Sequence, residues 1–144
     1  ANFDKLTVKS TEALNDALGQ ARKQGNPVVE DAHLLLALLQ QEEGIVTPVL
    51  QKVGANTGAL RETLAREIAR FPRQSSAQPT LSRQLNQILD RAEEEARSLG
   101  DEFVSTEHLL LALADVKGSE SRRMLTEAGA GRVVATVSPV DRSS

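Results

Sequence analysis

Two histidines are the residues in this 144-residue chain whose chemistry would be most versatile, because an imidazole can bind a metal or carry a proton. His33 and His108 are the only histidines, and the chain has no cysteine. A metal centre needs three or four convergent ligands. Each histidine also opens the same run, His-Leu-Leu-Leu-Ala-Leu, so duplication of a segment is enough to explain the pair. We therefore expect hydrogen-bonded structural histidines rather than metal ligands.

Catalytic motifs are missing around the other reactive residue types. Serine and aspartate are plentiful, but the sequence contains no nucleophile elbow. It also contains no Gly-x-x-x-x-Gly-Lys-Ser/Thr phosphate loop, so ATP cannot be cradled in the usual way. The acidic run 93–95 is most simply a solvated helix face with Arg91 and Arg97 nearby. We predict a non-catalytic domain without a cofactor of its own.

The shared run belongs to a longer internal repeat. Residues 6–55 align with residues 81–130 without a gap, at an offset of 75, and 16 of the 50 aligned positions are identical. The identical residues are core leucines, small residues and turn glycines, a pattern typical of a duplicated structural unit.

Helical periodicity organises the first unit. The helix expected at about 30–41 is apolar nearly all round, which predicts the buried central helix of its unit. Gly25 and the following Asn26-Pro27 end the preceding helix and leave Val28-Val29 extended. The four expected helices cover about 7–24, 30–41, 46–53 and 57–71.

The second unit repeats this plan after a polar linker at 72–79 that contains two prolines. We expect Thr80 to cap a long helix and Ser105 to cap the second buried helix. The expected elements are a helix at about 81–99, an extended piece at 101–104, the buried helix after 105 and a short helix at about 120–128. Residues 131–144 are rich in β-branched residues, which predicts an atypical tail. The fold class is therefore all-α, with two four-helix repeats (about 1–71 and 80–130) and a degenerate last helix.

Composition and charge argue against two classes of partner. The net charge is −3, the basic residues are interleaved with acidic ones, and Trp and Tyr are absent, so neither a basic face nor an aromatic platform for nucleic acid is visible. The apolar runs are far shorter than the ~20 residues that span a bilayer. We expect no nucleic acid and no membrane as partner, and the lack of cysteine fits a cytoplasmic location.

Several phrases of the sequence match a known family. Asp4-Lys5-Leu6-Thr7, residues 27–39 (PVVEDAHLLLALL) and residues 100–111 (GDEFVSTEHLLL) resemble the N-terminal Clp repeat domain of Clp-family AAA+ chaperones. The Phe71-Pro72 linker is most like that of ClpB-type disaggregases, and the tail from Gly131 departs from the family. The resemblance implies a pseudo-twofold helical module with a role in the stress response. Such a module engages unfolded or aggregated polypeptide and passes it to ATP-driven rings that are absent from this chain.

The resemblance also implies a substrate-binding surface. The polar positions that match those linked to substrate handling in ClpB-type domains are Thr7, Asp101 and Glu107. Phe103 and Val104 lie between the two acids and are expected to form an exposed apolar strip. The carboxylates could accept hydrogen bonds or a cation from an extended peptide, and the strip would add non-directional contact. Each polar residue has a structural explanation too: a helix cap for Thr7, a dipole-favoured first-turn acid for Glu107 and a loop residue for Asp101.

A second function stays open at this level, namely an adaptor-docking or regulatory module of a Clp protease ATPase. Protease-associated relatives hold phosphoarginine with Thr-Glu-His in both repeats. Here the second unit has Thr106-Glu107-His108, but the equivalent positions of the first unit are Asp31-Ala32-His33. The missing glutamate argues against a symmetric pair of phosphoarginine pockets and leaves at most one. We expect the isolated domain to be a monomer and the full-length relative to be a hexamer.

Overall fold

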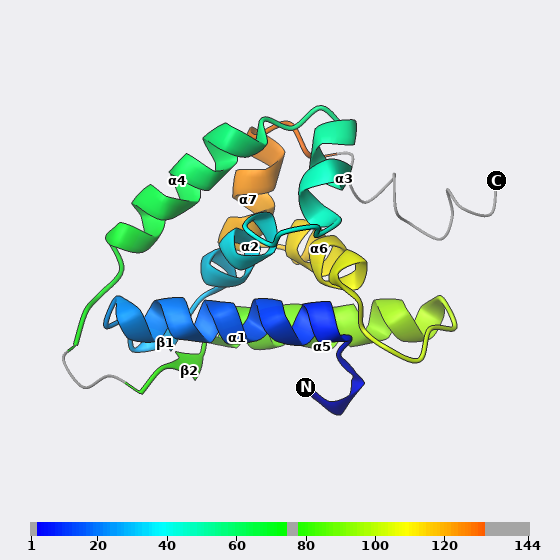
Figure 1. Cartoon of the computed structure of the whole chain (residues 1–144), viewed down its shortest axis with the longest axis horizontal. Helices are drawn as coiled ribbons and strands as arrows, with labels where there is room; N and C mark the ends of the chain where they lie inside the picture. The colour runs from blue at the N-terminus through cyan, green and yellow to red at the C-terminus, as the bar shows by residue number, and fades with distance from the viewer. Residues whose placement is uncertain (1–2, 75–77, 132–144) are drawn as a thin grey trace.

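The computed structural model describes residues 3–74 and 78–131, and its helices carry almost the whole fold. α1, α2, α3 and α4 belong to the first repeat, and α5, α6 and α7 to the second (Figure 1). The elements in chain order are the 3-10 helix η1 (Phe3–Lys5), α1 (Val8–Lys23), β1 (Val28–Val29), α2 (Asp31–Leu39), α3 (Val46–Lys52), α4 (Thr57–Ala69), β2 (Thr80–Leu81), α5 (Arg83–Ser98), α6 (Thr106–Asp115) and α7 (Glu120–Glu127). The predicted all-α class is confirmed, with β1 and β2 as a small addition.

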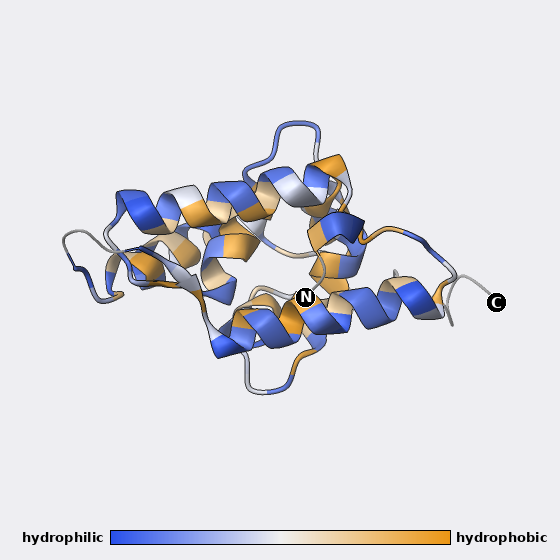
Figure 2. Ribbon diagram, turned by 90° about the horizontal axis from the view of Figure 1, so that it is seen from below, coloured by the Kyte–Doolittle hydropathy of each residue, from blue (hydrophilic) through white to orange (hydrophobic). Residues whose placement is uncertain are grey.

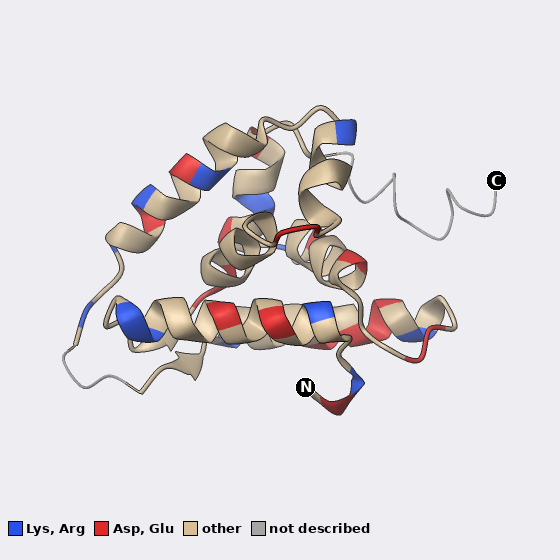
Figure 3. Ribbon diagram, viewed as in Figure 1, with Lys and Arg blue, Asp and Glu red and all other residues tan. Residues whose placement is uncertain are grey.

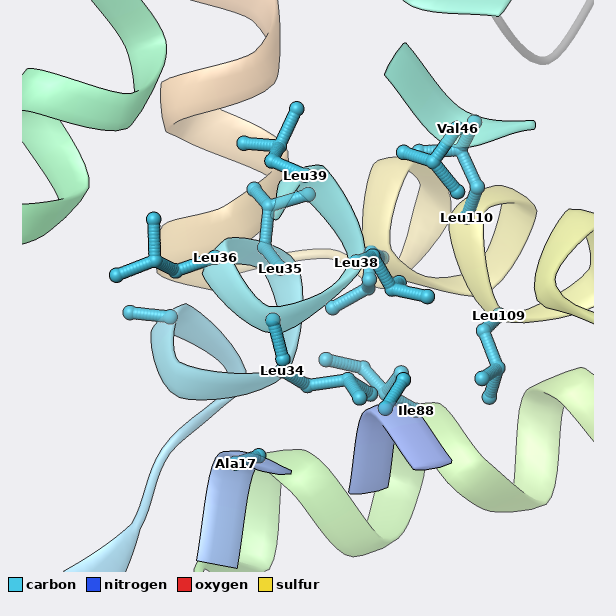
Figure 4. Packing of buried hydrophobic residues seen from close by; sticks show 14 of the residues in the cluster. Ala17, Leu34, Leu35, Leu36, Leu38, Leu39, Val46, Ile88, Leu109 and Leu110 are labelled. Atoms are coloured by element: carbon cyan, nitrogen blue, oxygen red, sulfur yellow. The ribbon is translucent and has the colours of Figure 1, made fainter. Parts of the chain in front are cut away.

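The two histidine-led helices form the centre of the core, as their all-round apolar sequences predict. Every residue of α2 is buried. Leu34 and Leu38 of α2 belong to one buried apolar cluster with Ile88 of α5 and Leu109 of α6 (Figure 4). Full burial of such a side chain stabilises the fold by roughly 1.5–3 kcal/mol. The long helices α1 and α5 run antiparallel beneath this pair (Figure 1).

The two repeats are joined by an exchange of extended segments. Leu6, before α1, pairs in parallel with Val104, before α6. Leu81, before α5, pairs in parallel with Val29, before α2. Adding the repeat offset of 75 to Leu6 gives Leu81, and adding it to Val29 gives Val104, so the two pairings are equivalent. This reciprocal exchange is the pseudo-twofold symmetry that the family resemblance implied, and it makes each repeat depend on the other.

The start of α5 differs from the sequence prediction. Thr80 is not the cap: it lies in β2, and Ser82 caps the helix by accepting a hydrogen bond from the Leu85 N–H at 2.9 Å. The reason is tertiary, because pairing with β1 holds Thr80 and Leu81 extended. The predicted degenerate last helix falls on residues 132–144, outside the described part of the chain. Among the described helices, none is both long and apolar enough to cross a bilayer.

Candidate functional site

His33 is buried at the start of α2, where its ring hydrogen-bonds the residues that cap this helix. Its Nδ1 accepts the Glu30 N–H at 2.9 Å, so the ring is neutral and carries its proton on Nε2. Nε2 donates to the Asn26 side-chain oxygen at 3.0 Å, and the Asn26 amide donates to the Pro72 carbonyl at 3.1 Å. The ring packs against Phe71 with centroids 5.3 Å apart. Burial lowers the pKa of His33 to about 4.

His108 repeats this cap in the second half with one change of chemistry. Its Nδ1 accepts the Ser105 N–H at 2.9 Å, and its Nε2 donates to the Asp101 carboxylate at 2.9 Å. Asp101 stands where the first repeat has Asn26. Both rings are the hydrogen-bonded structural histidines that the sequence predicts. Asp101, expected to lie at the substrate surface, serves as the histidine's partner while its side chain stays 47% exposed.

Thr7 and Val104 are brought together by main-chain bonds. The Thr7 N–H donates to the Val104 carbonyl at 3.0 Å, and the Val104 N–H donates to the Lys5 carbonyl at 2.7 Å. The Thr7 hydroxyl caps α1 by accepting the Ser10 N–H at 3.2 Å. The Ser10 hydroxyl donates to the same Val104 carbonyl at 2.9 Å. Thr7 is therefore the helix cap that one of the two interpretations predicted.

The expectation of an exposed apolar strip is wrong for Val104. Its side chain is 2% exposed and belongs to the core, because the strand pairing turns it inward. Of the two residues of the expected strip, only Phe103 is exposed, at 46%. The Lys5 ammonium lies 5.9 Å from its ring centroid. Glu107 lies in the first turn of α6 and interacts with a neighbouring group. A binding role for these five residues stays a prediction.

A groove of about 520 Å³ that the sequence did not indicate runs along α1. Leu14 and Leu18 of α1 line it together with Phe3 of η1. The chain before α5 contributes Pro79 and Leu81. Among the described residues, none that lines this groove carries a charge, and Phe3 is 49% exposed. Figure 2 shows the face of the molecule on which α1, α5 and the amino terminus lie. We name this feature the α1 groove.

The positions related to the α1 groove by the repeat offset include charged residues. Glu93 stands at the position equivalent to Leu18, and Asp4 at the position equivalent to Pro79. The hollow beside Glu93 is lined by five charged residues, Lys5, Glu93, Arg97, Asp101 and Glu102. Charged residues also occur along α1, α4 and α5 (Figure 3). The apolar groove therefore breaks the symmetry of the fold. Comparing Leu18 with Glu93 would have signalled this, whereas the contribution of Phe3 would not have been visible.

The comparisons with known proteins decide the family. Residues 5–128 match the family model of the Clp repeat (R) N-terminal domain. The chain belongs to this family. It is 42% identical over 129 residues to the chaperone protein ClpB of Propionibacterium freudenreichii, an alignment that covers 88% of this chain. The chain spans about 15% of the length of that curated relative.

Solved Clp N-domains share the fold. The Hsp104 N-terminal domain from Candida albicans superposes with a TM-score of 0.79 at 20% identity, covering 93% of this chain and 92% of that domain. The ClpV N-domain in complex with a VipB peptide superposes with a TM-score of 0.75 at 20% identity, covering 98% of this chain and 89% of that one. The expected Clp repeat fold is thus confirmed.

Proposed function

We propose that this domain recruits unfolded or aggregated polypeptides for an ATP-dependent ClpB-type disaggregase by binding their apolar segments in the α1 groove. The domain itself performs no catalysis in this proposal. It passes its client to AAA+ rings, hexameric and cytoplasmic in the full-length protein. The ClpB relative and the peptide complex of a ClpV N-domain both support a protein client.

The observation that carries the proposal is the uncharged lining of the α1 groove. Burying apolar surface is favourable without any directional requirement, so such a groove accepts many sequences. Two or three apolar side chains gain roughly 1.5–3 kcal/mol each on burial, and association costs at least ~4 kcal/mol. The balance is a weak affinity with little sequence preference, which suits a domain that must capture and then release diverse clients.

The test is fluorescence anisotropy of a labelled, permanently unfolded protein titrated with the 144-residue chain. Leu18→Glu gives the first repeat the acid that the second repeat has at Glu93, and a client segment would then have to desolvate a carboxylate. We expect a loss of affinity of at least tenfold. Ala65→Glu, on an exposed position of α4, introduces the same charge away from the groove and should leave binding unchanged. Equal binding by all three proteins would refute the proposal.

The second part of the proposal concerns a second surface, formed by Phe103 with Asp101 and Glu107, which we name the Phe103 surface. An exposed aromatic ring with Asp101 and Glu107 close in sequence would suit a client in which a basic residue neighbours an apolar one. This surface and the α1 groove are linked by the amino-terminal segment, because Leu6 lines the groove and pairs with Val104. A long client segment could therefore contact both.

Recognition of one defined partner is the alternative function, and the ClpV N-domain complex with a VipB peptide favours considering it. An adaptor peptide would use the same groove with higher affinity and stricter sequence requirements. A pulldown that yields one stoichiometric partner, together with no affinity for unfolded chains, would support this alternative. A phosphoarginine pocket at Thr106-Glu107-His108 likewise stays a prediction, to be checked by titration with free phosphoarginine.

A further inference from the structure

The strand that borders the α1 groove has one edge that β1 does not use. The Thr80 N–H donates to the Pro27 carbonyl at 3.1 Å, and the Ser82 N–H donates to the Val29 carbonyl at 2.9 Å. In a parallel ladder, alternate residues face opposite sides. The N–H and C=O of Leu81, between these two donors, therefore point away from β1, and Leu81 is one of the residues that line the groove.

The equivalent edge in the other half of the molecule is occupied. Leu6 is the counterpart of Leu81, and its N–H donates to the Phe3 carbonyl at 3.4 Å through the turn of η1. η1 thus covers the strand edge beside Val104. No bond from the Leu81 N–H is found within the described residues 3–74 and 78–131. The two strand edges consequently differ in the same sense as the two hollows: only the first-repeat side is both apolar and open.

The α1 wall of the groove adds polar groups that suit a polypeptide backbone. Thr11 and Asn15 are exposed, lie one helical turn apart and line the groove. A primary amide such as that of Asn15 both donates and accepts, so it can pair with a peptide group without reading a side chain. Between them the two walls offer hydrogen bonds to a main chain and apolar contact to side chains, and no charge.

We infer that the α1 groove binds its client as an extended strand, which adds to the outer edge of β2 and is hydrogen-bonded by the main chain of Leu81 and the side-chain amide of Asn15. This inference rests on the proposed function and specifies the bound form of the client. Successive side chains of a strand point to opposite faces, so every second residue of the client packs on Leu14 and Leu18 and the others face solvent. The uncharged lining restricts the client to segments without charge at the inward positions.

An N-methyl scan of a bound peptide tests this form. The probe is an uncharged, fluorescein-labelled peptide in which leucine alternates with serine, titrated with the 144-residue chain. N-methylation removes one main-chain donor at a time. A strand on an edge uses the N–H groups of alternate residues, so affinity should fall roughly fivefold at one parity of positions and change little at the other. Sensitivity without a two-residue period, or tighter binding of a helix-stapled version of the peptide, would overturn the inference while leaving the recruiting function intact.

Replacement of Asn15 separates main-chain recognition from simple apolar contact. Asn15→Leu enlarges the apolar surface of the groove, so an indiscriminate apolar groove would bind the peptide more tightly. If the Asn15 amide hydrogen-bonds the main chain of the peptide, Asn15→Leu should instead weaken the affinity roughly fivefold. Gln51→Leu, at an exposed position of α3 that does not line the groove, is the matched control and should bind as the unmodified chain does. If the unmodified peptide does not bind at all, both the inference and the proposed function fail, which distinguishes that outcome from failure of the inference alone.

Discussion

Acidification should remove the contribution that His33 makes to the stability of this domain. Its pKa lies at about 4 in the fold because the neutral ring is buried, whereas an unfolded histidine titrates near 6.5. A lowered pKa of a base means that the unfolded chain binds the proton first, so the stability that His33 contributes is complete above pH 6.5 and is lost as the pH falls toward 4. The loss amounts to about 2 kcal/mol at pH 5 and about 3 kcal/mol at pH 4.

Urea unfolding followed by circular dichroism at pH 7 and pH 5 measures this loss. His33→Gln removes the titrating group but keeps the helix cap, because a glutamine at this position of a capping box can accept the Glu30 N–H. The variant should lack the ~2 kcal/mol difference between the two pH values. Burial raises the pKa of the Glu30 carboxyl, which works in the opposite direction as the pH falls, and comparing chain with variant cancels that contribution.

His108→Gln is the matched control in the second repeat. It leaves His33 in place and must therefore retain the part of the loss that belongs to His33. A His33→Gln variant that loses as much stability between pH 7 and pH 5 as the unmodified chain would refute the burial argument.

Three further changes test other parts of the structure. Glu43 has a left-handed backbone (φ 58°), so Glu43→Gly should raise the unfolding free energy in urea by about 0.5–1 kcal/mol, and a loss of stability would contradict the assigned backbone. Asp31 is 3% exposed and accepts the Ser121 N–H at 2.8 Å across the two repeats; Asp31→Ala should cost about 2 kcal/mol, and the exposed Asp16→Ala about 0.5 kcal/mol at most. Glu107→Gln should weaken the anisotropy-measured binding of an apolar peptide that carries lysine several-fold at low salt, and unchanged affinity would remove Glu107 from the Phe103 surface.

The core could be read from the sequence because its signals are local. Eight consecutive apolar or histidine positions in α2 and seven in α6 leave no polar face, so burial of both helices follows without knowledge of their neighbours. The histidines were equally predictable, since duplication explained them better than ligation did. What the repeat alignment also contained, and sequence reasoning did not use, is the substitution of Asn26 by Asp101, which places a carboxylate at the second cap.

The errors arise where distant segments meet. The local sequence predicts Thr80 as a helix cap. In the structure β1, which lies 51 residues or more earlier in the chain, pairs with Thr80 and holds it extended. Val104 follows the exposed Phe103 in sequence, and a short extended segment does not reveal which of its alternating side chains faces inward until Leu6 pairs with it. The α1 groove combines η1, α1 and the chain before α5, three segments whose closeness no local pattern encodes.

The two repeats share a symmetric backbone fold but differ in their surfaces, and this difference affects the number of clients that one domain can bind. If the symmetric elements bound clients, each domain would offer two equivalent sites. The apolar lining and the open strand edge, however, occur on one side only, because Glu93 replaces Leu18 and η1 covers the edge at Leu6. The groove also needs both repeats, since α1 belongs to the first repeat and Leu81 to the second. If clients bind as we propose, each domain therefore offers one α1 groove to a client and not two symmetry-related ones.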